Sequence, residues 1–330
     1  MNFDKKFILF FLFSSRNVSE SKISDRINKI AELFGGGIRM TFNKIAFIGT
    51  GVMGSSIVRH LLKANYEVTI YTRTKERATA LISEGAKWAA TAGEAAAGAN
   101  IIITMVGYPA DVEAVYFESS GIFEAGSNGQ ILIDMTTSSP ALAKRIASVA
   151  VTRNMASIDA PVSGGDIGAK NGTLSIMCGG DEDVFKKVLP VLEVFGKDII
   201  YQGVAGAGQH TKMCNQIAIA TNMIGVCEAI VYAEKAGLDP ENVLKSISTG
   251  AAGSWSLSNL APRMLKGDYE PGFYVKHFLK DMDIALVEAE QMELNLPGLG
   301  LARSMYNQLQ EQGYGDNGTQ VIYKKYQSIS

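Results

Sequence analysis

A lysine and an asparagine spaced three residues apart are the first candidates for chemistry in this chain. Lys212 and Asn215 stand where a long apolar stretch begins, residues 209–235, which contains no proline. In a helix, residues i and i+3 share one face, so both side chains would point the same way. Burial lowers the pKa of a lysine toward the range in which it exchanges a proton with a substrate. The alternative is a surface lysine whose apolar stem packs along the helix.

A serine followed by two glycines offers a site for a small anion. Ser163, Gly164 and Gly165 come after the strand-like segment 157–160, in a stretch that holds further glycines. Residues without bulky side chains leave backbone N–H groups exposed, and the serine hydroxyl adds another donor. We therefore predict that these three residues bind a substrate carboxylate at the carboxyl end of a sheet, although the pattern alone also fits an ordinary loop.

A glycine-rich turn predicts a dinucleotide site. The segment follows the apolar strand 45–48, opens a helix-like segment, and consists of Gly49, Thr50, Gly51, Val52, Met53 and Gly54. In this pattern the first glycine allows a tight turn, the second lets the backbone approach a pyrophosphate, and the third lets the helix pack on the strand. The N-terminus of the helix then favours the anionic phosphates. The order strand, turn, helix and second strand favours this interpretation over an ordinary glycine-rich turn.

The residues after the second strand, 67–71, decide between NAD and NADP. An NAD site places Asp or Glu about 20 residues after the glycines, where it accepts a hydrogen bond from the ribose 2′-hydroxyl. This chain has Thr72, Arg73 and Thr74 there, without an acidic residue. Arginine can pair with a 2′-phosphate and threonine can donate to it, so we predict NADP as the preferred cofactor, with NAD possible. A solvated surface arginine is the alternative.

Alternating strand-like and helix-like segments indicate an α/β fold in the first part of the chain. We expect strands at 45–48, 67–71, 101–106, 131–135, 157–160, 173–177 and 198–201. We expect helices between them at 52–64, 77–84, 111–117, 140–153 and 181–194. Such alternation predicts a Rossmann-type, doubly wound and largely parallel sheet.

The pattern changes after Gly203, where helices alone follow. The long stretch 209–235 is apolar around most of its circumference, so other helices should bury it, at 240–248, 256–265, 278–292, 300–311 and 319–326. We predict an NADP-binding domain over 40–203 and an all-α substrate and oligomerisation domain over 204–330, built on a long interdomain helix. An apolar helix in a small domain also indicates burial by a second subunit, in a homodimer or homotetramer.

The composition argues against several classes of function. The 330-residue chain carries a net charge of −2, which gives no reason to expect nucleic acid or a membrane surface as a partner. With only three histidines in the chain, we do not expect a metal site built on several imidazoles. The three cysteines show no CxxC spacing and indicate a reduced, cytoplasmic protein. We also find no apolar run long enough to predict a membrane-spanning helix.

The first 39 residues need a separate interpretation. Lys5 and Lys6 precede a short apolar run, 7–13, that resembles a signal-peptide core, but no small-residue cleavage site follows. Consecutive glycines stand just before Met40, and glycine codons can spell a bacterial ribosome-binding sequence. We therefore expect translation to begin at Met40 and residues 1–39 to be a non-native or disordered extension. A membrane-tethered or exported form is the alternative, and the intact mass of the natively expressed protein distinguishes the two.

Four motifs in order resemble the β-hydroxyacid dehydrogenase family, which includes 3-hydroxyisobutyrate dehydrogenase and small semialdehyde reductases. They are the glycine turn, DAPVSGG-x-x-GA-x-x-GTL over 159–174, GAG-x-x-x-K-x-x-N over 206–215, and Lys280-Asp281. The likeness runs from Lys44 to about Lys325. It implies a reversible hydride transfer between a nicotinamide and a small hydroxy acid or its carbonyl partner.

The resemblance also implies a role for each residue of the site. Lys212 would be the catalytic acid and base, Asn215 would orient the substrate, and Asp281 would assist nearby. The segment 163–165 would hold the substrate, and Phe273 would border its pocket. Further residues would contact the cofactor, namely Met105, Val106, Thr137 and Lys280.

Departures from the family pattern leave some points open. Members often have Leu-Pro after the methionine of the third core strand, whereas this chain has Val106, Gly107 and Tyr108. Some members place the asparagine four residues after the lysine; that position is Gln216 here, so either amide could face the substrate.

Two other functions compete with this one. An imine reductase on the same scaffold usually lacks the lysine, and a catalytically silent NADP-binding module would be expected to lose it, so Lys212 counts against both. The three histidines, His60, His210 and His277, lie off the catalytic motif positions, and Trp255 is expected in the core.

Overall fold

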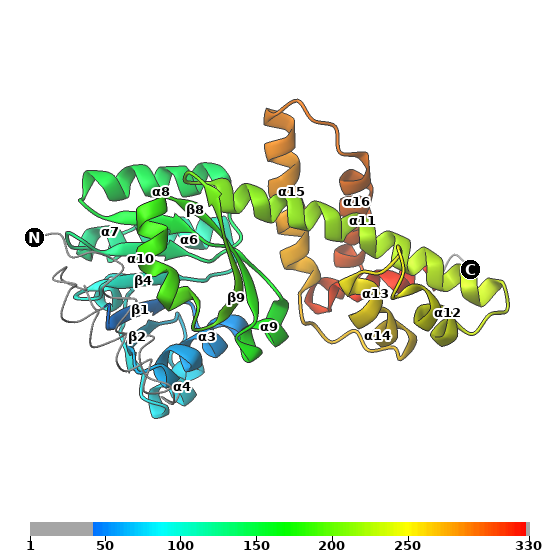
Figure 1. Cartoon of the computed structure of the whole chain (residues 1–330), viewed down its shortest axis with the longest axis horizontal. Coiled ribbons are helices and arrows are strands. Elements are labelled where there is room, and N and C mark those ends of the chain that lie inside the picture. The colour runs from blue at the N-terminus through cyan, green and yellow to red at the C-terminus, as the bar shows by residue number, and fades with distance from the viewer. Residues whose placement is uncertain (1–41, 328–330) are drawn as a thin grey trace, which may run out of the picture. The chain divides into compact units, whose positions relative to one another are not determined.

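The computed structural model describes residues 42–327 (Figure 1). The predicted extension over residues 1–39 lies outside the described residues. The described part has a sheet-containing half followed by a helical half, and helix α11 runs from one into the other.

One sheet organises the first half. Its strands are β1 (Lys44–Ile48), β2 (Glu67–Tyr71), β3 (Lys87–Trp88), β4 (Ile101–Thr104), β5 (Ile131–Asp134), β6 (Ala156–Asp159), β7 (Val162–Ser163), β8 (Leu174–Gly180) and β9 (Gly196–Gly203). The order is β3-β2-β1-β4-β5-β6-β8-β7, with β9 paired to β8. All neighbours from β3 to β6 are parallel, and β8 runs antiparallel to β6 and β7. The predicted doubly wound, largely parallel sheet is confirmed.

Helices cover both faces of this sheet because its strands are apolar on both sides. These helices are α3 (Val52–Lys63), α4 (Thr79–Ser83), α5 (Ala92–Ala96), α6 (Pro109–Phe117), α7 (Ile122–Ala125), α8 (Pro140–Thr152), α9 (Gly165–Asn171) and α10 (Glu182–Leu192). Alternate residues of a strand point to opposite faces. Ile45 and Phe47 of β1 accordingly pack in one apolar cluster with Leu61 of α3, while Ala46 and Ile48 pack in another with residues of α5 to α8.

The sheet order reverses between β1 and β4, which lie side by side although β2 and β3 come between them in the chain. In open parallel sheets, ligands bind outside the carboxyl ends of the strands at such a reversal. The glycine turn at residues 49–54 follows β1 at this point.

Helix α11 (Ala207–Lys235) is the core of the second half. Around it lie α12 (Pro240–Ile247), α13 (Trp255–Asn259), α14 (Ala261–Leu265), α15 (Val275–Gln291), α16 (Pro297–Glu311), the 3₁₀ turns Tyr314–Asp316 and Thr319–Ile322, and α17 (Tyr323–Gln327). Contrary to the sequence-based expectation, α11 is long and apolar enough to cross a membrane by length and composition. It packs against α15 and α16, however, and its buried residues join theirs in one apolar cluster, as in the core helix of a globular domain.

Asp159 attaches the start of α11 to the sheet. Its two carboxylate oxygens accept hydrogen bonds from the backbone N–H groups of Gly206 at 2.7 Å and Gln209 at 2.8 Å. The Gln209 side chain in turn accepts from the N–H of Ser138 and donates to the carbonyl oxygen of Thr136. Burial raises the pKa of Asp159, and the bonds to the helix N-terminus oppose this rise. These contacts fix the first turns of α11, which carry Lys212, relative to the carboxyl ends of β5 and β6.

Several predicted elements differ in the structure. The helix expected at 77–84 is a 3₁₀ turn, Lys75–Ala78, followed by the short α4. The helix expected at 256–265 is divided at Leu260 into α13 and α14, because Pro262 has no N–H to continue the helix. Two helices, α5 and α9, form in segments for which the sequence predicted no helix; the second lies in the stretch that also fitted an ordinary loop.

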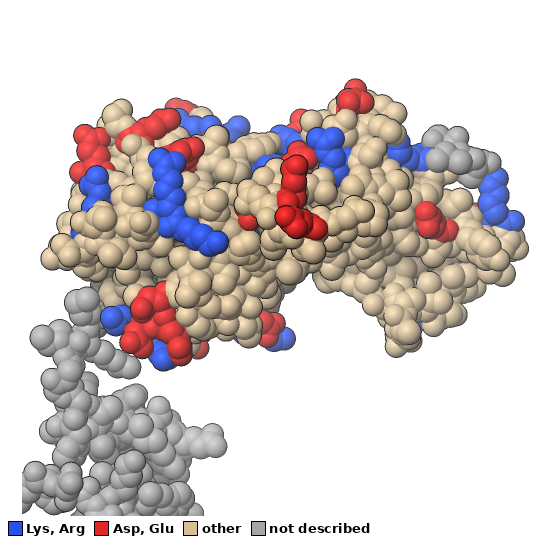
Figure 2. Space-filling view, turned by 90° about the horizontal axis from the view of Figure 1, so that it is seen from above, with Lys and Arg blue, Asp and Glu red and all other residues tan. Residues whose placement is uncertain are grey.

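The surface of the described part carries both signs of charge. Figure 2 shows basic and acidic side chains interspersed on the face that it displays, between wide uncharged areas. On this face no broad patch of one sign is seen.

Candidate active site

One large cleft lies at the carboxyl edge of the sheet and is closed on its other side by the helical half. Its volume is about 1350 Å³. Every residue that the sequence assigned to the site lines it. They are Gly49, Thr50, Gly51, Val52, Met53, Gly54, Thr72, Arg73, Thr74, Met105, Val106, Thr137, Ser163, Gly164, Gly165, Lys212, Asn215, Phe273, Lys280 and Asp281.

The glycine turn has the backbone geometry that a dinucleotide site needs. Gly49 has φ +101°, and a Cβ there would lie 2.2 Å from the carbonyl oxygen of Met105, so no other residue fits. Gly51, by contrast, has nothing within 4 Å of the position of a Cβ, so the space beside it is open to the cleft. Helix α3 begins at Val52 without a side-chain cap or an acidic residue in its first turn, which leaves its N–H groups for an anion.

A buried hydroxyl beside this turn has no partner within the described residues. Thr50 is 6% exposed, yet its Oγ1 makes no hydrogen bond there. An unsatisfied buried hydroxyl is costly unless a ligand or water meets it. The unpartnered hydroxyl of Thr50 and the open space at Gly51 show that the residues present fit the phosphate-bearing part of NAD(P).

Two arginines stand where the adenosine end of a dinucleotide would lie. Arg73 follows β2, and its guanidinium lies 3.2 Å from the carboxylate of Asp111 at the start of α6. The Arg73 side chain is 81% exposed, so it is able to leave Asp111 for a ligand. Arg77 also lines the cleft; sequence reasoning missed it because the residue was assigned to a helix.

Ser163, Gly164 and Gly165, which we call the carboxylate cradle, lie at the other end of the cleft. Ser163 ends β7, and Gly164 connects it to α9 with φ +126°, a conformation that side chains rarely adopt. Asp166 follows in the first turn of α9 and also lines the cleft. The cradle therefore combines backbone N–H groups and a hydroxyl with one nearby carboxylate.

Lys212 is the buried cation of the cleft. Its side chain enters from the second turn of α11, and the residue is only 7% exposed. Burial lowers the pKa of Lys212 to about 8; Asp281 opposes this effect and Lys280 adds to it. A lysine with this pKa can both donate and accept a proton near neutral pH.

Asp281 is held by neighbours on two helices. Its Oδ2 accepts a hydrogen bond from Nε2 of Gln216 at 2.5 Å, and Oε1 of Gln216 accepts from Nδ2 of Asn215 at 2.7 Å. Its Oδ1 lies 2.8 Å from Nζ of Lys280, an ion-pair distance, although this contact lacks the angles of a hydrogen bond. Nζ of Lys280 also donates to the carbonyl oxygen of Thr137 at 2.6 Å. This network joins α11, α15 and the loop after β5.

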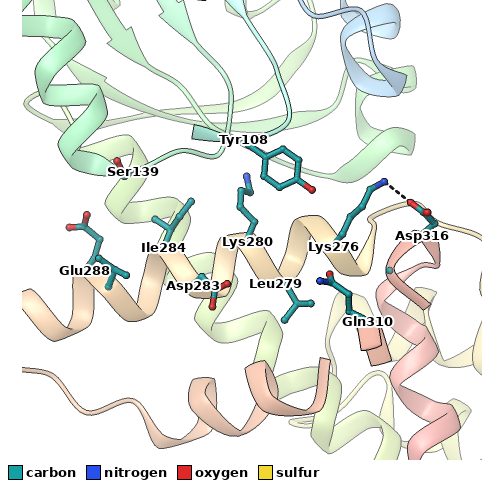
Figure 3. A pocket seen from close by; sticks show the side chains of 12 residues that line it. Tyr108, Ser139, Lys276, Leu279, Lys280, Asp283, Ile284, Glu288, Gln310 and Asp316 are labelled. Atoms are coloured by element: carbon teal, nitrogen blue, oxygen red, sulfur yellow. Dashed lines mark hydrogen bonds and ion pairs between the residues drawn. The ribbon is translucent and has the colours of Figure 1, made fainter. Parts of the chain in front are cut away.

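A second, smaller groove of about 750 Å³ lies along α15 (Figure 3). Lys276 and Lys280 extend from α15 toward the loop that carries Tyr108, and Lys276 pairs with Asp316. Tyr108 and both lysines line the cleft as well as the groove. The centre of the Tyr108 ring lies 5.3 Å from that of the His277 ring. Tyr108, one of the residues that depart from the family pattern, therefore forms a contact between the two halves.

The structure changes the interpretation of one tryptophan and one histidine. Trp255 is 58% exposed and lines the cleft, so the expectation that it belongs to the core was wrong. Trp255 is the first residue of the short α13. The buried side of this helix is formed by the next two residues, Ser256 and Leu257. His277 also lines the cleft, and burial lowers its pKa, whereas His210 is not among the lining residues.

Between residues 42 and 327 no group of three or more His, Cys, Asp or Glu side chains could hold a metal ion. The three cysteines are free: Cys178 and Cys227 are buried and Cys214 is exposed.

Comparison with known proteins gives two matching family models, one for each half. The NAD-binding domain of 6-phosphogluconate dehydrogenase matches residues 44–203. The NAD-binding domain of NADP-dependent 3-hydroxyisobutyrate dehydrogenase matches residues 206–326.

Relatives resemble the chain over most of its length. An uncharacterized oxidoreductase of Bacillus subtilis, YkwC, is 61% identical over 280 residues, which cover 85% of this chain and 97% of that protein. A probable 3-hydroxyisobutyrate dehydrogenase-like protein of Arabidopsis thaliana is 47% identical over 94% of this chain and 90% of its own. The solved structure of Mycobacterium tuberculosis 3-hydroxyisobutyrate dehydrogenase with L-serine has a TM-score of 0.79 at 29% identity, covering 87% of this chain and 99% of that one. The chain therefore belongs to the β-hydroxyacid dehydrogenase family and is an NAD(P)-dependent oxidoreductase.

Proposed function

We propose that this enzyme is an NADP-preferring dehydrogenase of small hydroxy acids, with Lys212 as the general acid and base. The observation that carries the proposal is the position of Lys212: a nearly buried lysine, with its pKa lowered to about 8, in the cleft that also contains the glycine turn and the 163–165 cradle. No other buried lysine with a lowered pKa occurs within residues 42–327.

Each part of the site has one task in this reaction. A bound nicotinamide supplies or takes up the hydride. In reduction, Nζ of Lys212 donates a proton to the carbonyl oxygen of the substrate, and in oxidation the neutral amine removes the proton from the hydroxyl. Ser163 and the N–H groups of Gly164 and Gly165 hold the carboxylate, so that the reacting carbon is oriented for hydride transfer.

The substrate end of the cleft favours small molecules with an apolar portion. Phe273 lines it from the helical half, and Trp255 and Ile167 are exposed at it from opposite sides. The relative from Mycobacterium tuberculosis was solved with L-serine, itself a small β-hydroxy acid. We therefore propose 3-hydroxy acids and the matching semialdehydes as the substrate class.

Replacing Lys212 tests the chemistry. We expect Lys212→Ala to lower kcat by several orders of magnitude on a panel of semialdehydes, glyoxylate and 3-hydroxy acids, while the Kd for NADPH stays nearly unchanged. Lys63→Ala removes an exposed lysine of α3 outside the cleft and serves as the matched control. Turnover retained in Lys212→Ala would show that another group transfers the proton.

The cofactor preference rests on Arg73, supported by Thr72, Thr74 and Arg77 along the same wall. The description of the family model for residues 206–326, which names an NADP-dependent enzyme, supports the same choice. We expect Arg73→Ser to raise KM for NADPH about 10- to 100-fold and to leave KM for NADH almost unchanged. This fold-change corresponds to the free energy of one charge-assisted hydrogen bond. An equal loss with both cofactors would mean that Arg73 contacts the shared part of the dinucleotide.

A further inference from the structure

Gln216 is a buried amide in the wall of the active-site cleft that the reaction described above does not use. It is 1% exposed, it follows Asn215 directly on α11, and it lies between Asn215 and Asp281. Both ends of its amide are bonded: Nε2 donates to Asp281 at 2.5 Å, and Oε1 accepts from Nδ2 of Asn215 at 2.7 Å.

The order of these bonds determines which way each amide faces. An ionised carboxylate only accepts hydrogen bonds, so Asp281 requires the NH₂ end of Gln216. The carbonyl end of Gln216 must then point to Asn215 and requires the NH₂ end of that residue. Turning either amide over would bring two acceptors or two donors together in a buried place, which is unfavourable.

These hydrogen bonds also determine which atom of Asn215 remains available in the cleft. With Nδ2 of Asn215 bonded to Gln216, its Oδ1 makes no hydrogen bond to any described residue. Asn215 lines the cleft three residues after Lys212, on the same face of α11. A fixed acceptor therefore stands beside the group that handles the proton.

We propose that Gln216 is a positioning residue, which uses Asp281 as its anchor to turn Asn215 so that Oδ1 accepts a hydrogen bond from the hydroxyl of the substrate. The proposal rests on the hydroxy acid dehydrogenase function given above. Asn215 contacts the substrate, and Gln216 acts only through it. Asp281, the partner of Gln216, interacts in turn with Lys212 on α11 and with the charged and titratable groups Lys280 and His277 on α15.

The first test is a double-mutant cycle. Gln216→Met keeps the volume but removes both hydrogen bonds, and we expect it to lower kcat/KM for the hydroxy acid about tenfold, mostly through KM, with an unchanged Kd for NADPH. In an Asn215→Ala background the same change should cost less than about twofold, because the residue through which Gln216 acts is missing. An undiminished tenfold loss in that background would overturn the proposal, since it would mean that Gln216 acts independently of Asn215.

The second test uses Gln216→Glu, which nearly preserves the shape of the side chain. A protonated glutamic acid can donate to Asp281 and accept from Asn215 as the amide does, whereas a glutamate repels Asp281. Relative to wild type at the same pH, the variant should approach full kcat/KM at about pH 5.5 and lose it as the pH rises to about 8. A ratio to wild type that does not change with pH would overturn the proposal, and this variant keeps it testable if Gln216→Met fails to fold.

A matched control separates positioning from stability. Gln130 is also a buried glutamine, 3% exposed, which donates to the carbonyl oxygens of Ala96 and Ala99 away from the cleft. Gln130→Met should lower Tm without altering KM. If wild type turns over no hydroxy acid, or Lys212→Ala remains active, the proposed function itself fails; if these behave as expected and only the Gln216 variants do not, the failure belongs to this inference.

Discussion

In the proposed reaction, Lys212 is the residue whose surroundings most directly set the chemistry. An ordinary surface lysine stays charged at neutral pH, but burial lowers the pKa of Lys212 to about 8. Asp281 works against this shift, which keeps the amine from losing its proton altogether. With this pKa, both forms of the side chain are populated near neutral pH, as the proposed proton transfer in either direction requires.

The pH dependence should be opposite for the two directions. Oxidation needs the neutral amine, so kcat/KM should rise with pH and level off above about 8; reduction needs the ammonium, so kcat/KM should fall above about 8. Initial rates over the pH range, with NADP in one direction and NADPH in the other, check this. Profiles that move together in both directions would point to a group other than Lys212.

Most of the residues assigned to the site from sequence belong to short, ordered motifs, which is why they could be singled out. All of them line one cleft. Tyr108, Arg77 and Trp255 were not assigned to the site, because each stands outside a motif and reaches the cleft only through the packing of distant segments. The roles of the two neighbouring amides, Asn215 and Gln216, also could not be separated from sequence, since the separation depends on contact with Asp281 on α15.

At the scale of elements, the strands and long helices follow the apolar pattern, and the errors lie in short segments. Helix α5 has only five residues, but Thr91 caps it and four of its residues are buried, so packing stabilises a segment for which no helix was predicted. Helix α9 contains glycines that favour loops, yet it packs on α3. Local sequence does not report such long-range contacts, which is why these two helices could not be predicted.

A buried carboxylate between β4 and β5 gives a test of stability at this scale. Asp134 is 4% exposed, and its Oδ1 accepts hydrogen bonds from Oγ1 of Thr104 at 2.8 Å and from the N–H of Thr136 at 3.1 Å. Burial raises the pKa of Asp134 from 3.8 to about 6. A pKa that is higher in the folded state contributes stability at low pH, and this contribution is lost as the pH rises through about 6.

We therefore expect Asp134→Asn, which keeps the acceptor and removes the charge, to be more stable than wild type at about pH 8, by on the order of 2 kcal/mol. The difference should shrink by about pH 5, where the wild-type carboxyl is largely protonated. Urea unfolding at both pH values measures it. A variant less stable than wild type at the higher pH would mean that the carboxylate charge is compensated in the fold.

At the scale of the whole described part, the site exists only because two unlike halves meet. The sheet supplies the glycine turn and the cradle, and the helical half supplies Lys212, Asn215 and Asp281. Asp159, Gln209 and Lys280 make hydrogen bonds that hold the halves together at the cleft: Asp159 to the start of α11, Gln209 to Thr136 and Ser138, and Lys280 to Thr137. The change from alternating strands to helices after Gly203 made this division predictable, because each pattern can be buried in only one kind of layer.

The helical half also leaves apolar side chains without cover, which predicts an oligomer. Four residues at the end of the α15–α16 hairpin are each more than half exposed: Val287, Met292, Leu294 and Leu301. Large exposed side chains gathered at one place favour contact with a second subunit.

We expect light scattering to give at least twice the mass of one chain, and Leu294→Asp with Leu301→Asp to reduce it. Val151→Asp, at an even more exposed position on α8, should leave the mass unchanged. A monomeric wild type would contradict the prediction, and an oligomer that survives the double change would place the interface elsewhere.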